Sequence, residues 1–278
     1  MPHDYPTNTT QAKARKIHGT IRFNETFDEE KYLSTELRNA IEDIKATRSE
    51  KQLHGLFQEI FPGVYSSESL FRTSLLEDLV KELNYQKSSG IPERRPNGMN
   101  RYGTILSDEE TSLLAPSIAK FVDNIVRPIA SSLFPAYASS NSMAMHYAFT
   151  VRYAEDEDRE LALHRDASVV TINLCLGTKF RGGLLSFSDW EESIKTDHHS
   201  LFSSNGDVDE NLKSSNTIQM TPGMSLWHRG QHQHQAHPIE SGERINLIVW
   251  LFAPNGDVRV APFPPHERMD LSGRWGEL

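Results

Sequence analysis

Cysteine is nearly absent from this chain, since Cys175 is the only one among 278 residues. A single thiol cannot form an internal disulfide, so the composition favours a reducing compartment. The N-terminal stretch from Met1 to Thr7 also has no apolar signal core. We therefore expect a cytoplasmic or nuclear protein that is not secreted, with Cys175 serving as a packing residue.

Long apolar runs and an excess of basic residues are missing as well. No apolar segment approaches the roughly 20 residues that a membrane-spanning helix needs. Acidic residues outnumber basic ones by 38 to 29, which gives a net charge of −9 at pH 7. Such a surface repels polyanions, so we expect neither a membrane nor a nucleic acid as a partner.

The chain is nevertheless long and apolar enough for one sizeable core. Hydrophobic residues make up 37% of the sequence and aromatic residues 9%, as in a globular protein with a polar surface. Residues 1–22 have little apolar periodicity and are predicted to form a flexible N-terminal arm. Residues 23–278 are predicted to form a single domain, with helical support at 23–140, strands at 143–254 and an irregular C-terminal tail at 255–278.

Apolar residues recur at helical spacing in the first half of the chain. Thr26 to Glu29 has the pattern of a capping box ahead of the first such run. Further elements follow, and we predict helices at Ser49 to Phe61, at Ser74 to Leu83 and from a cap at Ser107 to Glu110 through Ile125, a short strand at Val64 to Leu70, and a kink or restart at Pro128.

The second half changes to the shorter, alternating pattern of strands, as in Ala148 to Tyr153, Thr171 to Leu176 and Arg244 to Phe252. A polar segment at 188–217 interrupts them. We interpret it as a lid over a substrate, with a plain surface insertion as the alternative. Many short strands after a helical half predict an α+β, mainly β fold, namely a double-stranded β-helix (a jelly-roll, cupin-like barrel) buttressed by the N-terminal helices.

His164 and Asp166 lie in an apolar, β-branched run from Leu163 to Ile172. In an extended strand, side chains two positions apart point to the same face, so these two project together while Arg165 points away. A third candidate ligand comes late in the chain, in the segment from His234 to His237. Two histidines and one carboxylate on one face leave the other octahedral positions of a metal open, which is the arrangement that non-haem Fe(II) oxygenases use.

With their flanking motifs, these residues resemble the 2-oxoglutarate and Fe(II)-dependent dioxygenases, in the branch that contains prolyl and procollagen-lysyl hydroxylases. That branch has His-x-Asp, a distal histidine and an arginine ten residues later. His234 and Arg244 give this spacing, whereas His232 and His237 do not. The resemblance covers roughly residues 60–255, through the motifs Phe149 to Tyr153, His164 to Ser168, Thr171 to Leu174, Phe180 to Leu184 and Ser241 to Leu247, and Gly98 to Gly103 is similar to the soluble plant-type members.

The resemblance implies a ligand set. His164, Asp166 and His234 would hold Fe(II), and 2-oxoglutarate would be the cosubstrate, with ascorbate as a possible reductant. Arg244 would pair with the far carboxylate of the cosubstrate, because a guanidinium offers a planar fork that matches a carboxylate.

Tyr153, Asn173 and Thr171 are further candidates for contacts to the cosubstrate. The alternative is that these three polar side chains lie inside the barrel and satisfy one another. The remaining histidines and two tryptophans are predicted to be structural: His146, His228, His232, His237, Trp190 and Trp227.

The expected activity is hydroxylation of a C–H bond in an amino-acid-type substrate, with O2 consumed and 2-oxoglutarate converted to succinate. The substrate would be a peptidyl lysine or proline, a free amino acid or a small metabolite. Three alternatives stay open: a non-catalytic jelly-roll binding module, a small-molecule biosynthetic oxidase that catalyses desaturation or cyclisation, and a nucleic-acid demethylase, which the acidic charge disfavours. The oligomeric state is not predicted.

Overall fold

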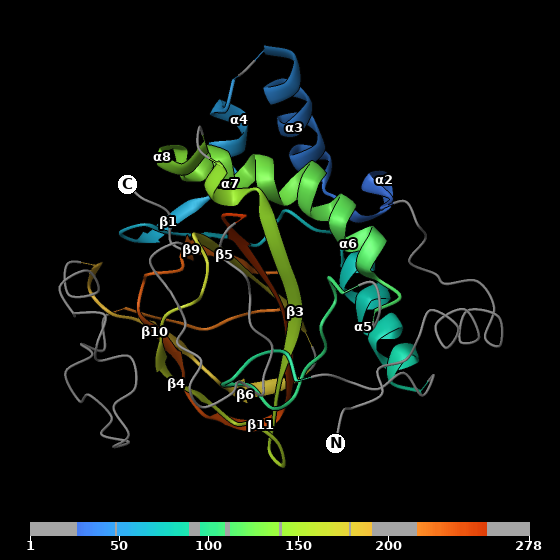
Figure 1. Cartoon of the computed structure of the whole chain (residues 1–278), viewed down its shortest axis with the longest axis vertical. Coiled ribbons are helices and arrows are strands. Elements are labelled where there is room, and N and C mark those ends of the chain that lie inside the picture. Colours follow the sequence, from blue (N-terminus) through green and yellow to red (C-terminus); the bar gives the residue numbers. More distant parts are fainter. Residues whose placement is uncertain are drawn as a thin grey trace.

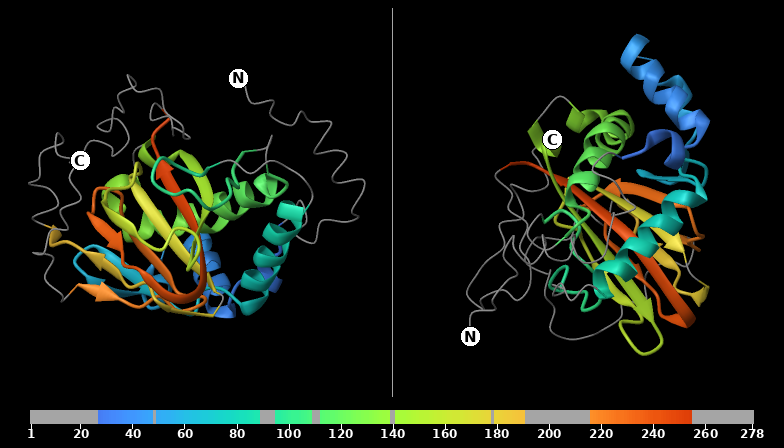
Figure 2. Two further views of the ribbon diagram at one scale, coloured as in Figure 1. Left: turned by 90° about the horizontal axis from the view of Figure 1, so that it is seen from below. Right: turned by 90° about the vertical axis from the view of Figure 1, so that its right-hand side faces the viewer.

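A barrel of antiparallel strands carries a group of helices on one side (Figure 1). In this computed structural model the described residues are 27–47, 49–88, 95–108, 112–138, 141–177, 179–190 and 216–254. Figure 2 shows the strands and the helices that pack on them from two further sides. Among the described helices, none combines the length and apolar character that a membrane crossing requires.

The helices come mainly from the first half of the chain, as predicted. The longest is α5, which has Leu75 and Leu79 buried on its inner face. The full set is α2 (Glu29–Tyr32), α3 (Thr35–Thr47), α4 (Lys51–His54), α5 (Thr73–Ser88), α6 (Ala115–Phe121), the π-helix η1 (Val122–Val126), α7 (Arg127–Leu133), α8 (Pro135–Ala138) and the 3-10 turn η2 (Asn141–Met143).

The strands form two antiparallel sheets. The larger has the order β1-β2-β9-β5-β11-β3, with β6 paired to β11, and the smaller has the order β4-β10-β7-β8. This confirms the prediction of a mainly β barrel with helical support. The strands are β1 (Gln58–Phe61), β2 (Val64–Ser67), β3 (Met145–Ala154), β4 (Leu161–His164), β5 (Val170–Gly177), β6 (Phe180–Gly182), β7 (Leu185–Phe187), β8 (Thr217–Ile218), β9 (Ser225–Arg229), β10 (His234–Ala236) and β11 (Ile239–Phe252).

Strand β11 divides the core into two parts, because alternate side chains of a strand point to opposite faces. Its outward residues pack with the helices in what we call the helix-side core: Ile245, Leu247, Val249 and Leu251. Its inward apolar residues pack in a second cluster, the barrel interior, together with residues of β3, β5 and β7. The helices therefore buttress one face of the larger sheet and leave the other face for the site.

The predicted helix at Ser49 to Phe61 is wrong beyond its first turn. Helix α4 ends at His54, with Gly55 at its C-cap, and Gln58–Phe61 is the strand β1. Pro62-Gly63 forms the turn of a hairpin, in which Gly63 has φ +73°, and β1 pairs there with β2. Pairing with a neighbouring strand therefore outweighed the helical spacing of the apolar residues.

Two predicted helix starts also lie elsewhere. Asp28 is the N-cap of α2 and accepts a hydrogen bond from the Lys31 backbone N–H, whereas Thr26 lies outside the described residues. Helix α6 begins only at Ala115, and the hydroxyl oxygen of Ser112 accepts from the backbone N–H of Leu114. A capping residue needs three following backbone groups in helical geometry, which the sequence pattern alone does not guarantee.

The predicted kink or restart at Pro128 is confirmed. The π-helix η1 ends one residue before α7, and Pro128 lies in the first turn of α7. Proline has no N–H to donate, and the first turn of a helix does not need one, so Pro128 is tolerated at this position.

Other predictions fall outside the described residues. These are the N-terminal arm 1–22, the tail 255–278 and most of the proposed lid, 191–215.

Candidate metal centre

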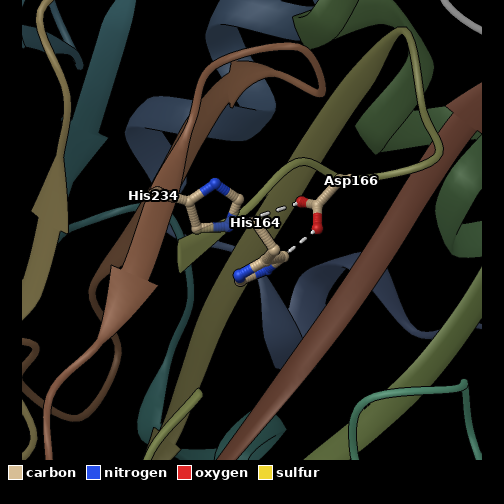
Figure 3. Close-up of side chains that lie close together, drawn as sticks. All are labelled: His164, Asp166 and His234. Carbon is tan, nitrogen blue, oxygen red and sulfur yellow. Dashed lines mark ion pairs between the residues drawn. The ribbon is translucent and has the colours of Figure 1, made fainter. Parts of the chain in front are cut away.

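Three side chains from separate elements converge in the barrel (Figure 3). One ligand atom from each of His164, Asp166 and His234 lies within 4.8 Å of the others. Asp166 stands between the histidines, with Oδ1 at 3.4 Å from His164 Nε2 and Oδ2 at 3.7 Å from His234 Nε2. Two imidazoles and a carboxylate at such distances form the donor set of a facial triad.

Strand pairing places the two histidines. His164 is the last residue of β4 and His234 the first of β10, and they are register partners across the smaller sheet. Their rings lie with centroids 4.3 Å apart. The predicted continuous strand through Asp166 is wrong, because β4 stops at His164 and β5 starts at Val170. The expectation that Arg165 points away is consistent with its Nε, which donates to the Gln231 carbonyl.

Asp166 is fixed by its neighbours instead of by a strand. Its backbone N–H donates to the Gly230 carbonyl at 2.9 Å. The Thr171 hydroxyl donates to Asp166 Oδ2 at 2.7 Å and also contacts the Ser168 hydroxyl. Gly230 permits this approach, since a Cβ there would lie 2.0 Å from the Ser168 carbonyl oxygen.

Both histidines are held in the tautomer that a metal needs. His164 Nδ1 lies 2.8 Å from the Ala162 carbonyl oxygen, and His234 Nδ1 lies 2.8 Å from the His232 carbonyl oxygen. A carbonyl can only accept, so each Nδ1 carries the hydrogen. In the neutral ring Nε2 then carries the lone pair, and each Nε2 faces Asp166.

The charges of the cluster also suit a divalent cation. Burial by itself raises the pKa of Asp166, but the facing histidines His234 and His164 outweigh it and hold this pKa well below its usual value. Burial lowers the pKa of His234 well below its ordinary value, and the neighbouring His164 lowers it further. At neutral pH the pair is therefore an ionised carboxylate beside a neutral imidazole, which is the state that binds metal.

His228 lies closer to the site than we predicted. It is buried in β9, and its Nε2 lies 4.0 Å from Asp166 Oδ2. Its Nδ1 hydrogen-bonds with the Arg229 carbonyl, and burial lowers its pKa. His228 is the register partner of Thr171. Only the pairing of β9 with β5 reveals this neighbour, so no local motif signals it.

Arg244, on the inward face of β11, is among the largest fully buried side chains that the structure describes. It is 1% exposed, and burial lowers its pKa. Its Nη1 donates to the Gly183 carbonyl, and its Cζ lies 4.8 Å from the ring centre of Tyr153. Its Nε is buried without a hydrogen-bond partner. A buried guanidinium with one carbonyl partner is costly, so the arrangement fits an absent carboxylate ligand.

The three other predicted cosubstrate contacts all lie in the barrel. Thr171 holds Asp166. Asn173 Oδ1 accepts from Asn246 Nδ2 at 2.5 Å. Tyr153 is buried against Arg244, and this burial raises its pKa. Their contacts to a cosubstrate stay predictions.

The histidines and tryptophans predicted to be structural do not join the ligand cluster. His232 Nε2 contacts the Ser188 carbonyl, and burial lowers its pKa to about 4. His237 contacts the Ser186 hydroxyl. Trp227 is buried in the helix-side core. Trp190 stacks on the guanidinium of Arg229, with Cζ 3.4 Å from the ring centre.

Comparison with known proteins decides the family. The model described as OGFOD2-like domain matches residues 20–139, and the model of the 2OG-Fe(II) oxygenase superfamily matches residues 139–253. A Danio rerio protein named 2-oxoglutarate and iron-dependent oxygenase domain-containing protein 2 is 30% identical over 271 residues, which is 94% of this chain and 70% of the relative. The chain belongs to the 2-oxoglutarate and Fe(II)-dependent oxygenases. The metal of this family is Fe(II) and its cosubstrate is 2-oxoglutarate, as predicted.

Two further similarities show how much of a relative this chain covers and which fold it shares. The protein of the same name from Xenopus tropicalis is 34% identical over 243 residues, which is 86% of this chain and 64% of that protein. The chain thus spans less than two thirds of this relative. A crystal structure of prolyl 4-hydroxylases from Phytophthora capsici is similar with a TM-score of 0.50 at 16% identity, over 88% of this chain and 74% of the other. This likeness shows the shared fold.

Proposed function

We propose that this oxygenase hydroxylates a C–H bond of an amino-acid-type substrate and converts 2-oxoglutarate and O2 to succinate and CO2. The observation that carries the proposal is Arg244, a buried cation on the same barrel as the metal triad, with a guanidinium nitrogen left unpartnered. A dicarboxylic keto acid satisfies both features at once, because one end can chelate a metal and the other can pair with the arginine.

The residues divide the work between holding and orienting. His164, Asp166 and His234 would hold Fe(II), which would supply the activation of O2. Their Nδ1 contacts to backbone carbonyls fix the orientation of both imidazoles, and Thr171 keeps the carboxylate in place. Arg244, supported by the Gly183 carbonyl and the Tyr153 ring, orients the cosubstrate. Burial of these groups keeps water away from the reacting end.

Succinate formation tests the proposal. Purified protein with Fe(II), 2-oxoglutarate, O2 and a pool of peptides and amino acids should release succinate, and should release none when the metal is chelated. A folded protein that binds 2-oxoglutarate but never forms succinate with any substrate would be a binding module, and the proposed activity would be wrong.

A further inference from the structure

A surface groove beside β6 contains none of the three metal ligands. It is lined by residues 179–182 and 219–222, so it lies where β6 meets the segment that follows β8. This is the end of the barrel away from α3 and α4 (Figure 1). Its volume is about 500 Å³, within the range of roughly 300–1,000 Å³ that small-molecule sites occupy.

The groove is positively charged, although the chain as a whole is acidic. Lys179 and Arg181 line it, and none of its described lining residues is acidic. These two side chains are two positions apart, so in an extended segment they share a face and their Cα atoms lie roughly 7 Å apart. A positive groove on a chain of net charge −9 attracts anions.

Both cations are available to a ligand. Among the described residues, the Lys179 ammonium makes no ion pair or hydrogen bond. Arg181 Nη2 lies 3.8 Å from Glu240 Oε2, and both side chains are mostly exposed, so this pair is weak. The backbone that carries the two cations is fixed, because the Lys179 carbonyl accepts from the Glu243 N–H at 3.2 Å and Arg181 pairs with Ser241 of β11.

The opposite wall of the groove is partly apolar. Met220 and Pro222 contribute hydrocarbon surface. The Gln219 amide is already used, since its Nε2 lies 3.1 Å from the Gly182 carbonyl oxygen and 3.3 Å from that of Met220. A simple inorganic anion would leave the hydrocarbon surface in water, whereas a molecule with a carbon skeleton would cover it. The lining therefore matches an organic molecule that carries more than one negative charge.

The groove also shares backbone with the cosubstrate site. Gly182 lines the groove, and the carbonyl of the next residue, Gly183, accepts a hydrogen bond from Arg244 Nη1. Phe180 lines the groove as well, and its ring centre lies 5.6 Å from Arg244 Cζ. An anion in the groove therefore acts on the segment that holds Arg244, and its charge repels a second anion that approaches this arginine.

We propose that the groove is a regulatory site for a small organic polyanion, namely a carbon skeleton with two or more carboxylates, and that its occupancy weakens the binding of 2-oxoglutarate. The inference goes beyond the proposed function, because it concerns a second site. It rests on cosubstrate binding at Arg244 and not on the substrate that is hydroxylated.

Benzene-1,3,5-tricarboxylate is the probe for the site, and the uncharged benzene-1,3,5-trimethanol is its control. Binding is measured by calorimetry on the full-length Arg244→Leu variant, in which the cation of the cosubstrate site is removed, so that binding reports the groove. The tricarboxylate should bind, and the triol should not.

Charge removal then assigns the binding to the groove. Lys179→Gln combined with Arg181→Gln should weaken tricarboxylate binding at least about 10-fold, or ~1.4 kcal/mol. Lys45→Gln combined with Lys81→Gln is the matched control, because it removes the same charge from exposed positions on α3 and α5. It should leave the affinity for the tricarboxylate within about twofold of the original value.

The regulatory effect is measured on protein that retains Arg244, loaded with Mn(II). Saturating tricarboxylate should raise the 2-oxoglutarate Kd about fivefold or more, the lower end of typical coupling between two sites. The variant without Lys179 and Arg181 should show no such rise. A direct competition at Arg244 would instead raise the Kd equally in both proteins.

Each contrary result has a definite meaning. Equal binding of the tricarboxylate by the two double variants, or equal binding of the triol, would overturn the site. Binding in the groove without a change in the 2-oxoglutarate Kd, or an equal change in both proteins, would overturn the regulatory role. Succinate formation is assayed without the tricarboxylate, so a failure of the proposed function would appear there and would leave binding in the groove measurable.

Discussion

The two faces of β11 differ in whether their buried side chains all have suitable partners. Outward residues such as Leu247 and Val249 are buried among apolar partners of the helix-side core. Inward residues Arg244, Asn246 and Trp250 each have a buried polar atom without a hydrogen-bond partner, namely Nε, Oδ1 and Nε1. The outward face of this strand thus contributes stability, whereas its inward face has polar atoms without hydrogen-bond partners. Such atoms are expected where a ligand completes a site.

The difference has a direct consequence for mutations. Truncation on the outward face should cost stability and leave ligand binding intact. Truncation of the inward polar side chains, or of the metal ligands, should cost ligand binding and leave stability nearly intact. Five substitutions test this contrast, and we order them by the size of the expected effect.

His234→Ala should have the largest effect. It removes one of three metal ligands, so iron-dependent turnover should fall by more than about 100-fold, the upper loss that changes around a ligand shell produce. His237→Ala is the control, because this ring contacts Ser186 outside the triad. Succinate release by the two variants is the measurement. Equal loss in both, with folding intact, would mean that the distal ligand is misassigned.

Arg244→Leu tests the inward face of β11 directly. It removes the cation that pairs with the cosubstrate, so the 2-oxoglutarate Kd should rise at least about 30-fold. Stability without cosubstrate should be unchanged or higher, since the buried guanidinium has one carbonyl partner.

Leu247→Ala is the counterpart on the outward face. Leu247 is 2% exposed in the helix-side core, so the variant should lose about 2–5 kcal/mol of unfolding free energy. Its 2-oxoglutarate Kd should not change. Denaturant unfolding measures the unfolding free energy of Arg244→Leu and Leu247→Ala, and calorimetry measures their 2-oxoglutarate Kd. If each variant changes both the unfolding free energy and the Kd, the two faces of β11 do not differ as stated.

Gly183→Ala should weaken the cosubstrate affinity by a smaller amount. A Cβ on Gly183 would lie 2.9 Å from Arg244 Nη1 and 3.3 Å from Cζ, so the guanidinium must move. We expect an increase in the 2-oxoglutarate Kd of about 10-fold, or ~1.4 kcal/mol.

Gly182→Ala controls for backbone strain. Both glycines have positive φ, +74° at Gly182 and +66° at Gly183, but a Cβ on Gly182 would meet Glu240 and Pro238 instead of Arg244. Both variants should lose about 1–2 kcal/mol of stability. Only Gly183→Ala should lose cosubstrate affinity, and a similar loss in Gly182→Ala would assign the effect to strain.

Thr171→Val should have an effect of about the same size as Gly183→Ala, on the affinity for the metal instead of the cosubstrate. It removes the hydroxyl that donates to Asp166 at 2.7 Å while the side chain keeps its shape. Affinity for Mn(II) should fall about 10-fold. Thr171→Ser retains the hydroxyl and should bind Mn(II) as the wild type does. If both variants bind alike, Thr171 does not position the carboxylate.

The metal ligands could be predicted from the sequence because metal chemistry restricts them to few residue types. His164 and Asp166 lie two apart in the chain, and the spacing of His234 from Arg244 is maintained by one turn and one strand. His228 could not be predicted, because its approach to Asp166 depends on how β9 pairs with β5. The role of Thr171 beside Asp166 was missed because a continuous strand was expected where the chain leaves β4 and enters β5.

The fold class followed from the change between helical and alternating periodicity, yet one helix was wrong. Leu56, Phe57 and Ile60 have helical spacing, but they are only partly buried against the two cores. This segment instead forms β1, which pairs with β2. Strand β2 in turn pairs with β9, which lies far along the chain. Local pattern cannot report such pairing.

Calorimetric titration of 2-oxoglutarate with and without Mn(II) tests the central claim most directly. The account predicts that one molecule of 2-oxoglutarate binds per chain when the metal is present, and that binding is lost or greatly weakened when it is removed. No binding in the presence of the metal, or equal affinity without it, would contradict the account.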